Sequence, residues 1–254
     1  MKALKKEKQG KTYRHVGRIL AIILAVAVLA VGYYANDYYH AAETAVAALK
    51  DTSAVDVEVD EKDGVITFMP ENPMAGIIFY PGGKVEYTAY APLLKKFAEQ
   101  GVACVLIEMP MNLAVLDVNA ADGIKEQYSE IDTWYMAGHS LGGAMAASYV
   151  AEHTEDYAGL ILLGAYSEAN LFESGLQVIS LYGSEDKILD VEKYEELKTN
   201  LPETTSCMVL GGGCHSYFGD YGMQEGDGEA TLTMEQQMDS TASYVVKQMK
   251  YAAE

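Results

Sequence analysis

The sequence predicts an α/β domain with a mostly parallel central sheet and helices on both faces. Two observations support this class: short apolar segments alternate with helix-forming segments along most of the chain, and half of the 254 residues are apolar. Strands that alternate with helices at this spacing are typical of a parallel sheet covered on both sides. A chain of this length can bury one large core, whereas two full domains would be cramped.

The expected elements follow one another in a regular order. An antiparallel hairpin comes first and lies at the sheet edge, because Val55, Val57 and Val59 alternate with acidic residues and a turn at 61–64 precedes the apolar segment 65–69. Further strands are expected at 76–80, 102–109, 132–138, 159–164, 176–183 and 207–211. Helices are expected near 90–100, 120–128, 141–153, 191–201 and 235–250. Residues 216–234 form the longest irregular stretch, and long ordered loops are often functional.

The charge distribution excludes one class of partner. The net charge is −19, yet residues 1–18 hold seven basic residues and one acidic residue, so this segment carries +6 and the remainder −25. A surface with this much negative charge repels the phosphate backbone of nucleic acids, so no nucleic-acid partner is expected. The three cysteines match no zinc-binding spacing, and no metal site is expected.

An uninterrupted apolar segment precedes the domain. Residues 19–35 lack charged side chains, follow a basic segment and end in tyrosines, which fits a transmembrane signal anchor with the positive side inside. We therefore expect a basic cytoplasmic segment at 1–18, an anchor at 19–35, a stalk at 36–54 and the main domain, outside the cytoplasm, at 55–254. A cleaved signal peptide followed by secretion is the alternative, although no convincing cleavage site is visible.

A candidate nucleophile lies between the strand at 132–138 and the helix that follows it. The sequence GHSLGG places Ser140 in a G-x-S-x-G pattern at a strand-to-helix junction. A nucleophilic serine needs a sharp turn there, and Gly138 and Gly142 supply the small neighbours that such a turn requires. The helix N-terminus also favours negative charge that develops at Ser140.

The candidate base follows by elimination among five histidines. His15 and His40 lie in or near the apolar segment, and His139 is expected to point away from its neighbour Ser140. His153 is about 20 Å along the following helix. His215 remains, on a loop after the strand at 207–211, at the sheet edge where parallel sheets place their sites.

A carboxylate and two amides complete the expected site. Asp186 follows the strand at 176–183 and is expected to hold the imidazole of His215 in the right tautomer, with Glu185 and Asp190 as fallback candidates. The oxyanion is expected to be bound by the amide of Leu141 and by one from residues 81–84, for which Gly83 is preferred.

These residues together resemble the α/β-hydrolase superfamily from about Val55 to the C-terminus. GHSLGG is similar to lipase and esterase motifs, while YPGG, YAPL, AEQG and YGSED look like the lidless branch that includes dienelactone-hydrolase-like proteins. The chain departs from that pattern at Pro81, where relatives often have His, and at Ser140, where dienelactone hydrolases use Cys.

The resemblance implies the α/β-hydrolase fold and hydrolysis of an ester, thioester or amide without a cofactor. We therefore expect a membrane-anchored serine hydrolase, with a carboxylesterase acting on small or medium acyl esters as the first hypothesis. A thioesterase or peptidase on the same three side chains is one alternative, because a fold alone does not choose among these reactions. A non-catalytic envelope binding protein is the other.

Overall fold

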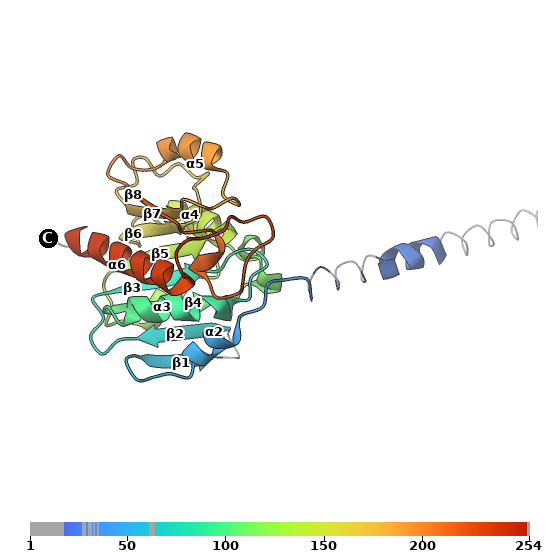
Figure 1. Cartoon of the computed structure of the whole chain (residues 1–254), viewed down its shortest axis with the longest axis horizontal. Helices are drawn as coiled ribbons and strands as arrows, with labels where there is room; N and C mark the ends of the chain where they lie inside the picture. The colour runs from blue at the N-terminus through green and yellow to red at the C-terminus, as the bar shows by residue number, and fades with distance from the viewer. Residues whose placement is uncertain are drawn as a thin grey trace, which may run out of the picture. The chain divides into compact units, whose positions relative to one another are not determined.

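The computed structural model describes residues 18–26, 29, 32, 34, 36–60 and 64–252, with side chains omitted at 57–60 and 250–252. The chain divides into two units, Met1–Tyr38 and Tyr39–Glu254 (Figure 1). In the first unit, residues 18–26 are helical, and the apolar side chains there that are described are exposed. Among the described residues, no helix combines the length and the apolarity that a membrane span requires. The anchor expected at 19–35 lies partly outside the described residues.

The second unit contains an eight-stranded sheet with the order β1-β2-β4-β3-β5-β6-β7-β8. The strands are β1 (Asp56–Asp60), β2 (Val65–Met69), β3 (Ala75–Tyr80), β4 (Val102–Ile107), β5 (Trp134–His139), β6 (Gly159–Leu163), β7 (Gln177–Gly183) and β8 (Ser206–Leu210). β1 and β2 form the predicted antiparallel hairpin at the edge, and β2 also pairs antiparallel with β4. All pairs from β4 through β3 to β8 are parallel. This is the mostly parallel sheet that the alternating apolar segments predict.

Helices cover both faces of the sheet (Figure 1). They are α2 (Glu43–Ala48), α3 (Ala91–Ala98), α4 (Leu141–Glu152), α5 (Val191–Leu197) and α6 (Met234–Ala252). α3 and α6 contact each other on one face, while α4 packs against β3, β5 and β6. Short 3₁₀ turns occur at η1 (Tyr87–Tyr90), η2 (Pro110–Asn112), η3 (Ala114–Leu116), η4 (Lys125–Gln127), η5 (Lys198–Asn200) and η6 (Ser216–Phe218).

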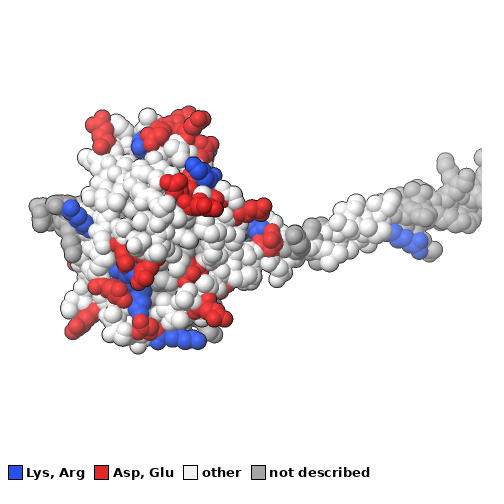
Figure 2. Space-filling view, viewed as in Figure 1, with Lys and Arg blue, Asp and Glu red and all other residues white. Residues whose placement is uncertain are grey.

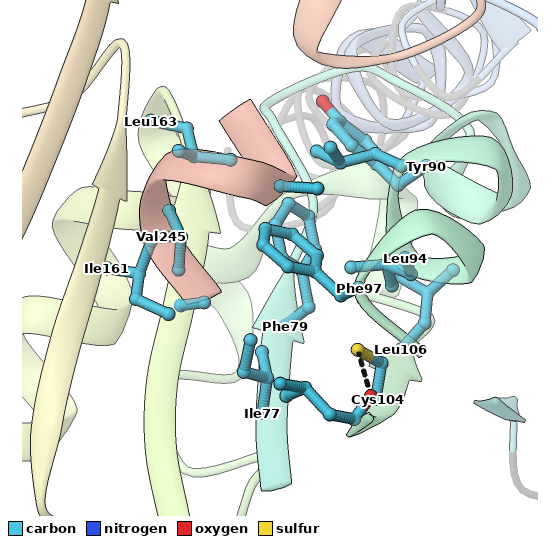
Figure 3. Close-up of a cluster of buried hydrophobic side chains, with 14 of the residues drawn as sticks. Ile77, Phe79, Tyr90, Leu94, Phe97, Cys104, Leu106, Ile161, Leu163 and Val245 are labelled. Atoms are coloured by element: carbon cyan, nitrogen blue, oxygen red, sulfur yellow. Dashed lines mark hydrogen bonds between the residues drawn. The ribbon is translucent and has the colours of Figure 1, made fainter. Parts of the chain in front are cut away.

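Alternate side chains along each strand enter two separate cores. In β3, Ile77 and Phe79 belong to the cluster beneath α3 and α6, whereas Ile78 and Tyr80 belong to the cluster beneath α4. Successive side chains of a strand point to opposite faces, so a strand that is apolar at every position must be covered on both sides. Figure 3 shows the first core, in which Phe79 lies among side chains of α3, α6 and the neighbouring strands.

Two expectations differ from the structure. The helix predicted near 120–128 is absent from this described stretch, which instead forms turns and the short η4. Gly123 adopts a φ of +74° there, and a residue in this left-handed region ends a right-handed helix.

The second difference concerns the segment 36–54, predicted to be a stalk. The compact unit begins at Tyr39, which forms a β-bridge with Val85. Tyr39, Ala41, Ala48 and Leu49 pack against the buried core, and Lys95 Nζ donates to the carboxylate of Asp51 at 2.5 Å. Helix-forming composition alone does not distinguish an isolated helix from one whose apolar residues pack on a domain.

In the second unit, acidic side chains are distributed over several helices, strands and loops rather than gathered in one cluster. Figure 2 shows them on the face viewed in Figure 1, where basic side chains lie among some of them. Ion pairs on the surface of the described residues include Lys96 with Asp239, Lys125 with Asp156, Lys193 with Glu168, and Lys198 with Glu195. Exposed pairs of this kind contribute at most about 1 kcal/mol each, so the sheet and its two cores provide most of the stability.

Candidate active site

Ser140 occupies a sharp turn between β5 and α4. Its backbone has φ +53° and ψ −124°, an uncommon conformation for a residue with a side chain. A conformation of this kind costs about 1–3 kcal/mol and persists only where the surroundings enforce it. The turn places Ser140 at the carboxyl end of the central strand and directly before the N-terminus of α4.

The glycines of GHSLGG allow this turn to form because backbone segments approach them closely. A Cβ atom on Gly138 would lie 2.5 Å from the carbonyl carbon of Gly142. A Cβ atom on Gly142 would lie 2.2 Å from the carbonyl oxygens of Tyr80 and Pro81. Both distances are far inside van der Waals contact with atoms that cannot move aside, so only glycine fits at either position.

His215 and Asp186 form a buried pair. His215 Nδ1 lies 2.8 Å from Asp186 Oδ2, and the side chains are 1% and 0% exposed. The other carboxylate oxygen of Asp186 accepts from the amides of Ile188 (2.9 Å) and Leu189 (2.8 Å). An ionised carboxylate only accepts hydrogen bonds, so Nδ1 of His215 carries the proton and, in the neutral ring, Nε2 holds a lone pair.

The fallback carboxylates lie elsewhere. Glu185 accepts a hydrogen bond from the hydroxyl of Ser184 at 2.9 Å. Asp190 caps the N-terminus of α5, where it accepts from the amide of Lys193 at 3.0 Å. Of the three acids considered, Asp186 is therefore the one hydrogen-bonded to His215.

Ser140 and His215 line the same cavity, which has a volume of about 270 Å³. The rest of its wall is formed by Leu141, Ala144, Gly164, Ala165, Tyr166, Ile188, Leu189 and Asp190. Nε2 of His215 is buried and has no hydrogen-bond partner among the described residues. The structure thus brings a serine on a strained turn and an imidazole with an available lone pair to one cavity.

The two residues expected to bind an oxyanion lie close to each other. Leu141 begins α4, and Gly83 lies in the loop that follows β3. A Cβ atom on Gly83 would approach Leu141 Cδ2 to 2.9 Å and Leu113 Cδ2 to 3.7 Å. Among the hydrogen bonds between described residues, the amides of Gly83 and Leu141 do not act as donors, so both remain available to a ligand.

His139, expected to point away from Ser140, contacts two side chains near the site, Tyr90 and His215. Its ring is buried and lies 4.4 Å from the ring of His215, measured between centroids. Its Nδ1 lies 2.8 Å from the hydroxyl of Tyr90. Burial, together with the charge of nearby His215, lowers the pKa of His139 well below its ordinary value. The neutral ring is therefore the favoured form.

Two further side chains that the sequence analysis missed hold the loop carrying His215. The amide group of Gln237 accepts from Cys214 N at 2.9 Å and donates to Cys214 O at 2.8 Å. Asp227 accepts from the amides of His215 (3.3 Å) and Ser216 (2.8 Å) and from the Ser216 hydroxyl (2.7 Å). Burial raises the pKa of Asp227, but the hydrogen bonds from Ser216, Gly228 and Lys187 outweigh it and leave the pKa below its ordinary value.

These contacts leave only weak signals in the sequence. Gln237 and Asp227 lie 23 and 12 residues from the backbone groups they bind, so no local spacing reveals them. The position of Asp227 in the long irregular stretch 216–234 was the one available hint. Within the described part of the chain, no group of three or more His, Cys, Asp or Glu side chains has the arrangement of a metal site.

Comparisons with known proteins agree with this architecture. Residues 76–239 match the model of a family described as the Alpha/beta hydrolase family. The structure of TT1662 from Thermus thermophilus aligns with a TM-score of 0.56 at 16% identity, over 78% of this chain and 97% of that one. Est1E from Butyrivibrio proteoclasticus aligns with a TM-score of 0.53 at 13% identity, over 78% and 100% of the two chains.

A dienelactone hydrolase from Anabaena variabilis is also similar, with a TM-score of 0.55 at 12% identity over 78% of this chain and 98% of that one. No match was found among curated protein sequences. At these identities the structural likenesses establish the fold, whereas the family model covers well over half of this chain.

Proposed function

This chain belongs to the alpha/beta hydrolase family, and from that premise we propose that it is a serine hydrolase acting on small or medium acyl esters. The observation that carries the proposal is the arrangement of Ser140, His215 and Asp186. The serine sits on a strained turn, and the buried imidazole beside the same cavity is hydrogen-bonded to a carboxylate through Nδ1. Acyl transfer by a serine uses these three groups, namely a hydroxyl, a neutral imidazole and a carboxylate that orients the imidazole.

The proposed reaction has two steps. The hydroxyl oxygen of Ser140 attacks the ester carbonyl while Nε2 of His215 takes the hydroxyl proton, and the imidazolium then gives that proton to the departing alcohol. Water attacks the resulting acyl-enzyme with His215 again acting as the base, which releases the acid and restores Ser140. Asp186 holds the ring and stabilises the imidazolium, while the amides of Leu141 and Gly83 bind the oxyanion.

The cavity favours a small, uncharged acyl group. Its volume is about 270 Å³, slightly below the usual range of about 300–1,000 Å³ for small-molecule sites. Ala144, Ala165, Ile188 and Leu189 supply apolar wall, whereas no Lys or Arg is among its described lining residues. A carboxylate on the acyl group would meet Asp190 and no compensating cation, so neutral acyl esters are the proposed substrates.

A substrate panel tests this assignment. We expect the wild-type protein to hydrolyse neutral short-chain esters and Ser140→Ala to lose this activity while keeping its fold. Ester, thioester and amide versions of one acyl group separate an esterase from a thioesterase or a peptidase. Turnover that persists in Ser140→Ala would exclude Ser140 as the nucleophile, and lack of turnover with every substrate would favour a binding protein.

We also propose that residues 19–35 anchor the chain in a membrane, with the hydrolase domain outside the cytoplasm. The uncharged sequence of this segment, its basic flank and the exposed apolar side chains of the helical residues 18–26 support the proposal. The test is cell fractionation combined with protease treatment of intact cells. A membrane-bound, externally cleavable domain is expected; recovery in the medium would favour cleavage, and an inaccessible domain would contradict the orientation.

A further inference from the structure

Tyr90 joins the loop that holds Gly83 to the turn that holds Ser140. Its hydroxyl oxygen accepts from the amide of Gly82 at 3.0 Å and lies 2.8 Å from His139 Nδ1. Tyr90 and His139 are both buried, with exposures of 0% and 1%. Figure 3 shows the Tyr90 ring at the edge of the buried cluster, with its hydroxyl directed away from Leu94 and Phe97.

The Tyr90 hydroxyl can accept one of these hydrogen bonds and donate the other. An amide N–H can only donate, so the Tyr90 oxygen uses a lone pair for Gly82 and has its own proton left to donate. We assign the Tyr90 proton to His139 Nδ1, because the hydroxyl has no other acceptor among the hydrogen bonds of the described residues. The neutral ring then carries its proton on Nε2, which has no hydrogen-bond partner among those residues. Burial favours the same neutral form, because it lowers the pKa of His139. With this assignment, Gly82 N–H donates to the Tyr90 oxygen, and the Tyr90 hydroxyl donates in turn to His139 Nδ1.

The hydrogen bonds of Gly82 orient the amide of the next residue. The carbonyl of Gly82 accepts from the amide of Val85 at 3.2 Å, while its N–H is held by Tyr90. The carbonyl of Gly82 and the N–H of Gly83 belong to one planar trans peptide and point in opposite directions. Fixing Gly82 on both sides therefore fixes the direction of the Gly83 N–H, the proposed oxyanion donor.

This restraint matters because two successive glycines are conformationally permissive. It also explains why Gly82 is a glycine. A Cβ atom there would lie 2.7 Å from the Tyr90 hydroxyl and 2.9 Å from His139 Nδ1. A side chain at this position would displace the hydroxyl that holds the loop.

We propose that Tyr90 and His139 are positioning residues that hold the Gly82–Gly83 peptide in a fixed orientation relative to Ser140. The inference rests on the proposed function, because an oxyanion donor has a role only if Ser140 forms a tetrahedral intermediate. Neither Tyr90 nor His139 is among the described residues that line the cavity, and we assign neither of them a contact with the substrate. Their effect on catalysis is exerted through the Gly83 amide and through the ring contact between His139 and His215.

Tyr90→Phe tests the proposal, because it removes the hydroxyl and keeps the ring. An oxyanion donor contributes chiefly in the transition state, so we expect kcat and kcat/KM for a short neutral ester to fall together by about 10- to 100-fold with little change in KM. Labelling of Ser140 by a fluorophosphonate should slow similarly, because that reaction also develops charge on an oxygen in the oxyanion site. Amide hydrogen exchange of Gly82 should accelerate.

Tyr135→Phe is the matched control. Tyr135 is a buried tyrosine whose hydroxyl donates to Gln177 at 2.8 Å. Tyr135 lies near the start of β5 and Gln177 at the start of β7, at the sheet edge opposite the site. We expect this variant to lose stability without losing kcat. Equal kcat in Tyr90→Phe and wild type, or equal losses in Tyr90→Phe and Tyr135→Phe, would overturn the proposal.

A second pair of variants keeps the test decisive if Tyr90→Phe folds poorly. In His139→Asn the amide oxygen can accept from Tyr90 in place of Nδ1, whereas His139→Leu offers no acceptor. We expect the Asn variant to retain more kcat than the Leu variant, and equal kcat would overturn the role of this hydrogen bond. Failure of the proposed function differs from all these outcomes, because the wild-type protein itself would then neither be labelled nor hydrolyse an ester.

Discussion

His215 Nδ1 and Asp186 Oδ2 lie 2.8 Å apart, although their residues are 29 positions apart in the sequence and lie on loops after different strands. β7 and β8 are parallel neighbours, so their carboxyl ends meet at one edge of the sheet. The amides of Ile188 and Leu189 bind the second oxygen of Asp186, which leaves Oδ2 directed to the ring. The backbone thus orients the carboxylate, and the carboxylate orients the imidazole.

Asp186→Asn should abolish most activity with little effect on the fold. The asparagine oxygen can keep the bonds from Ile188 and Leu189, which turns its NH₂ group toward His215. Nδ1 must then accept, the ring proton moves to Nε2, and the base is lost. We expect kcat to fall by about 10³- to 10⁴-fold. Glu185→Gln is the control and should keep kcat within about twofold; a nearly unchanged kcat in Asp186→Asn would remove Asp186 from the site.

Asp227 should contribute stability that depends on pH. Its pKa is lowered in the folded protein, so the contribution is present above the ordinary value of 3.8 and is lost as the pH falls through the lower folded value. We expect Asp227→Asn to reduce the free energy of unfolding by about 1–2 kcal/mol at neutral pH, allowing for partial exposure of the carboxylate. Urea unfolding across pH should show this difference shrinking in acid.

Asp239→Asn is the control for the unfolding measurements on Asp227→Asn, because the carboxylate of Asp239 is exposed. It pairs with Lys96 on the surface, and Asp239→Asn should change stability by less than about 1 kcal/mol. A difference between wild type and Asp227→Asn that stays constant from neutral pH down to acid would contradict the assigned role of Asp227.

Gly142→Ala should destabilise the turn that carries Ser140. The added Cβ would meet the carbonyl oxygens of Tyr80 and Pro81 at 2.2 Å, so strands β3 and β5 or the start of α4 must shift. We expect a loss of at least about 1–3 kcal/mol in unfolding free energy and a loss of esterase activity. Gly211→Ala is the control, because nothing lies within 4 Å of its Cβ position; similar Tm values for the two variants would contradict the account.

Asp190 should influence which acyl groups are accepted. Asp190 is among the residues that line the cavity, and one oxygen of its carboxylate caps α5. Asp190→Asn keeps the capping group and removes the charge. We expect kcat/KM for an ester with a carboxylate on its acyl chain to rise by about two- to fivefold relative to the neutral ester of equal length, a modest effect because the side chain is exposed. Glu192→Gln, outside the cavity wall, should leave this ratio unchanged, and an unchanged ratio in Asp190→Asn would exclude the effect.

The sequence predicted the parallel sheet well because its strands are apolar at nearly every position. Ile77 through Phe79 in β3 and Val102 through Leu106 in β4 are fully buried on both faces, and this produces the short apolar segments that are visible in the sequence. The predicted helix near 120–128 was wrong because Gly123 takes a left-handed conformation. The packing of residues 39–50 was missed because small residues such as Ala41 and Ala48 give no local sign of their tertiary contacts.

The site was predictable to the extent that a local motif or the order of elements determines it. Ser140 lies in a motif of adjacent residues, and His215 and Asp186 each follow a strand whose end lies at the expected edge. Gln237 and Asp227 could not be predicted, because they bind backbone groups of the 214–216 loop through contacts that only the folded chain creates. The role of Tyr90 could not be predicted either, since nothing local in the sequence indicates its bond to Gly82.

The central claim is that Ser140 is an activated nucleophile with His215 as its base. The most direct measurement is labelling with a fluorophosphonate probe, followed by mass spectrometry of the labelled peptide, for wild type, Ser140→Ala and His215→Ala. The account predicts a single label on Ser140 of the wild type, none at this position in Ser140→Ala, and strongly reduced labelling in His215→Ala. Absence of label on folded wild-type protein, or label of equal intensity in Ser140→Ala, would contradict it.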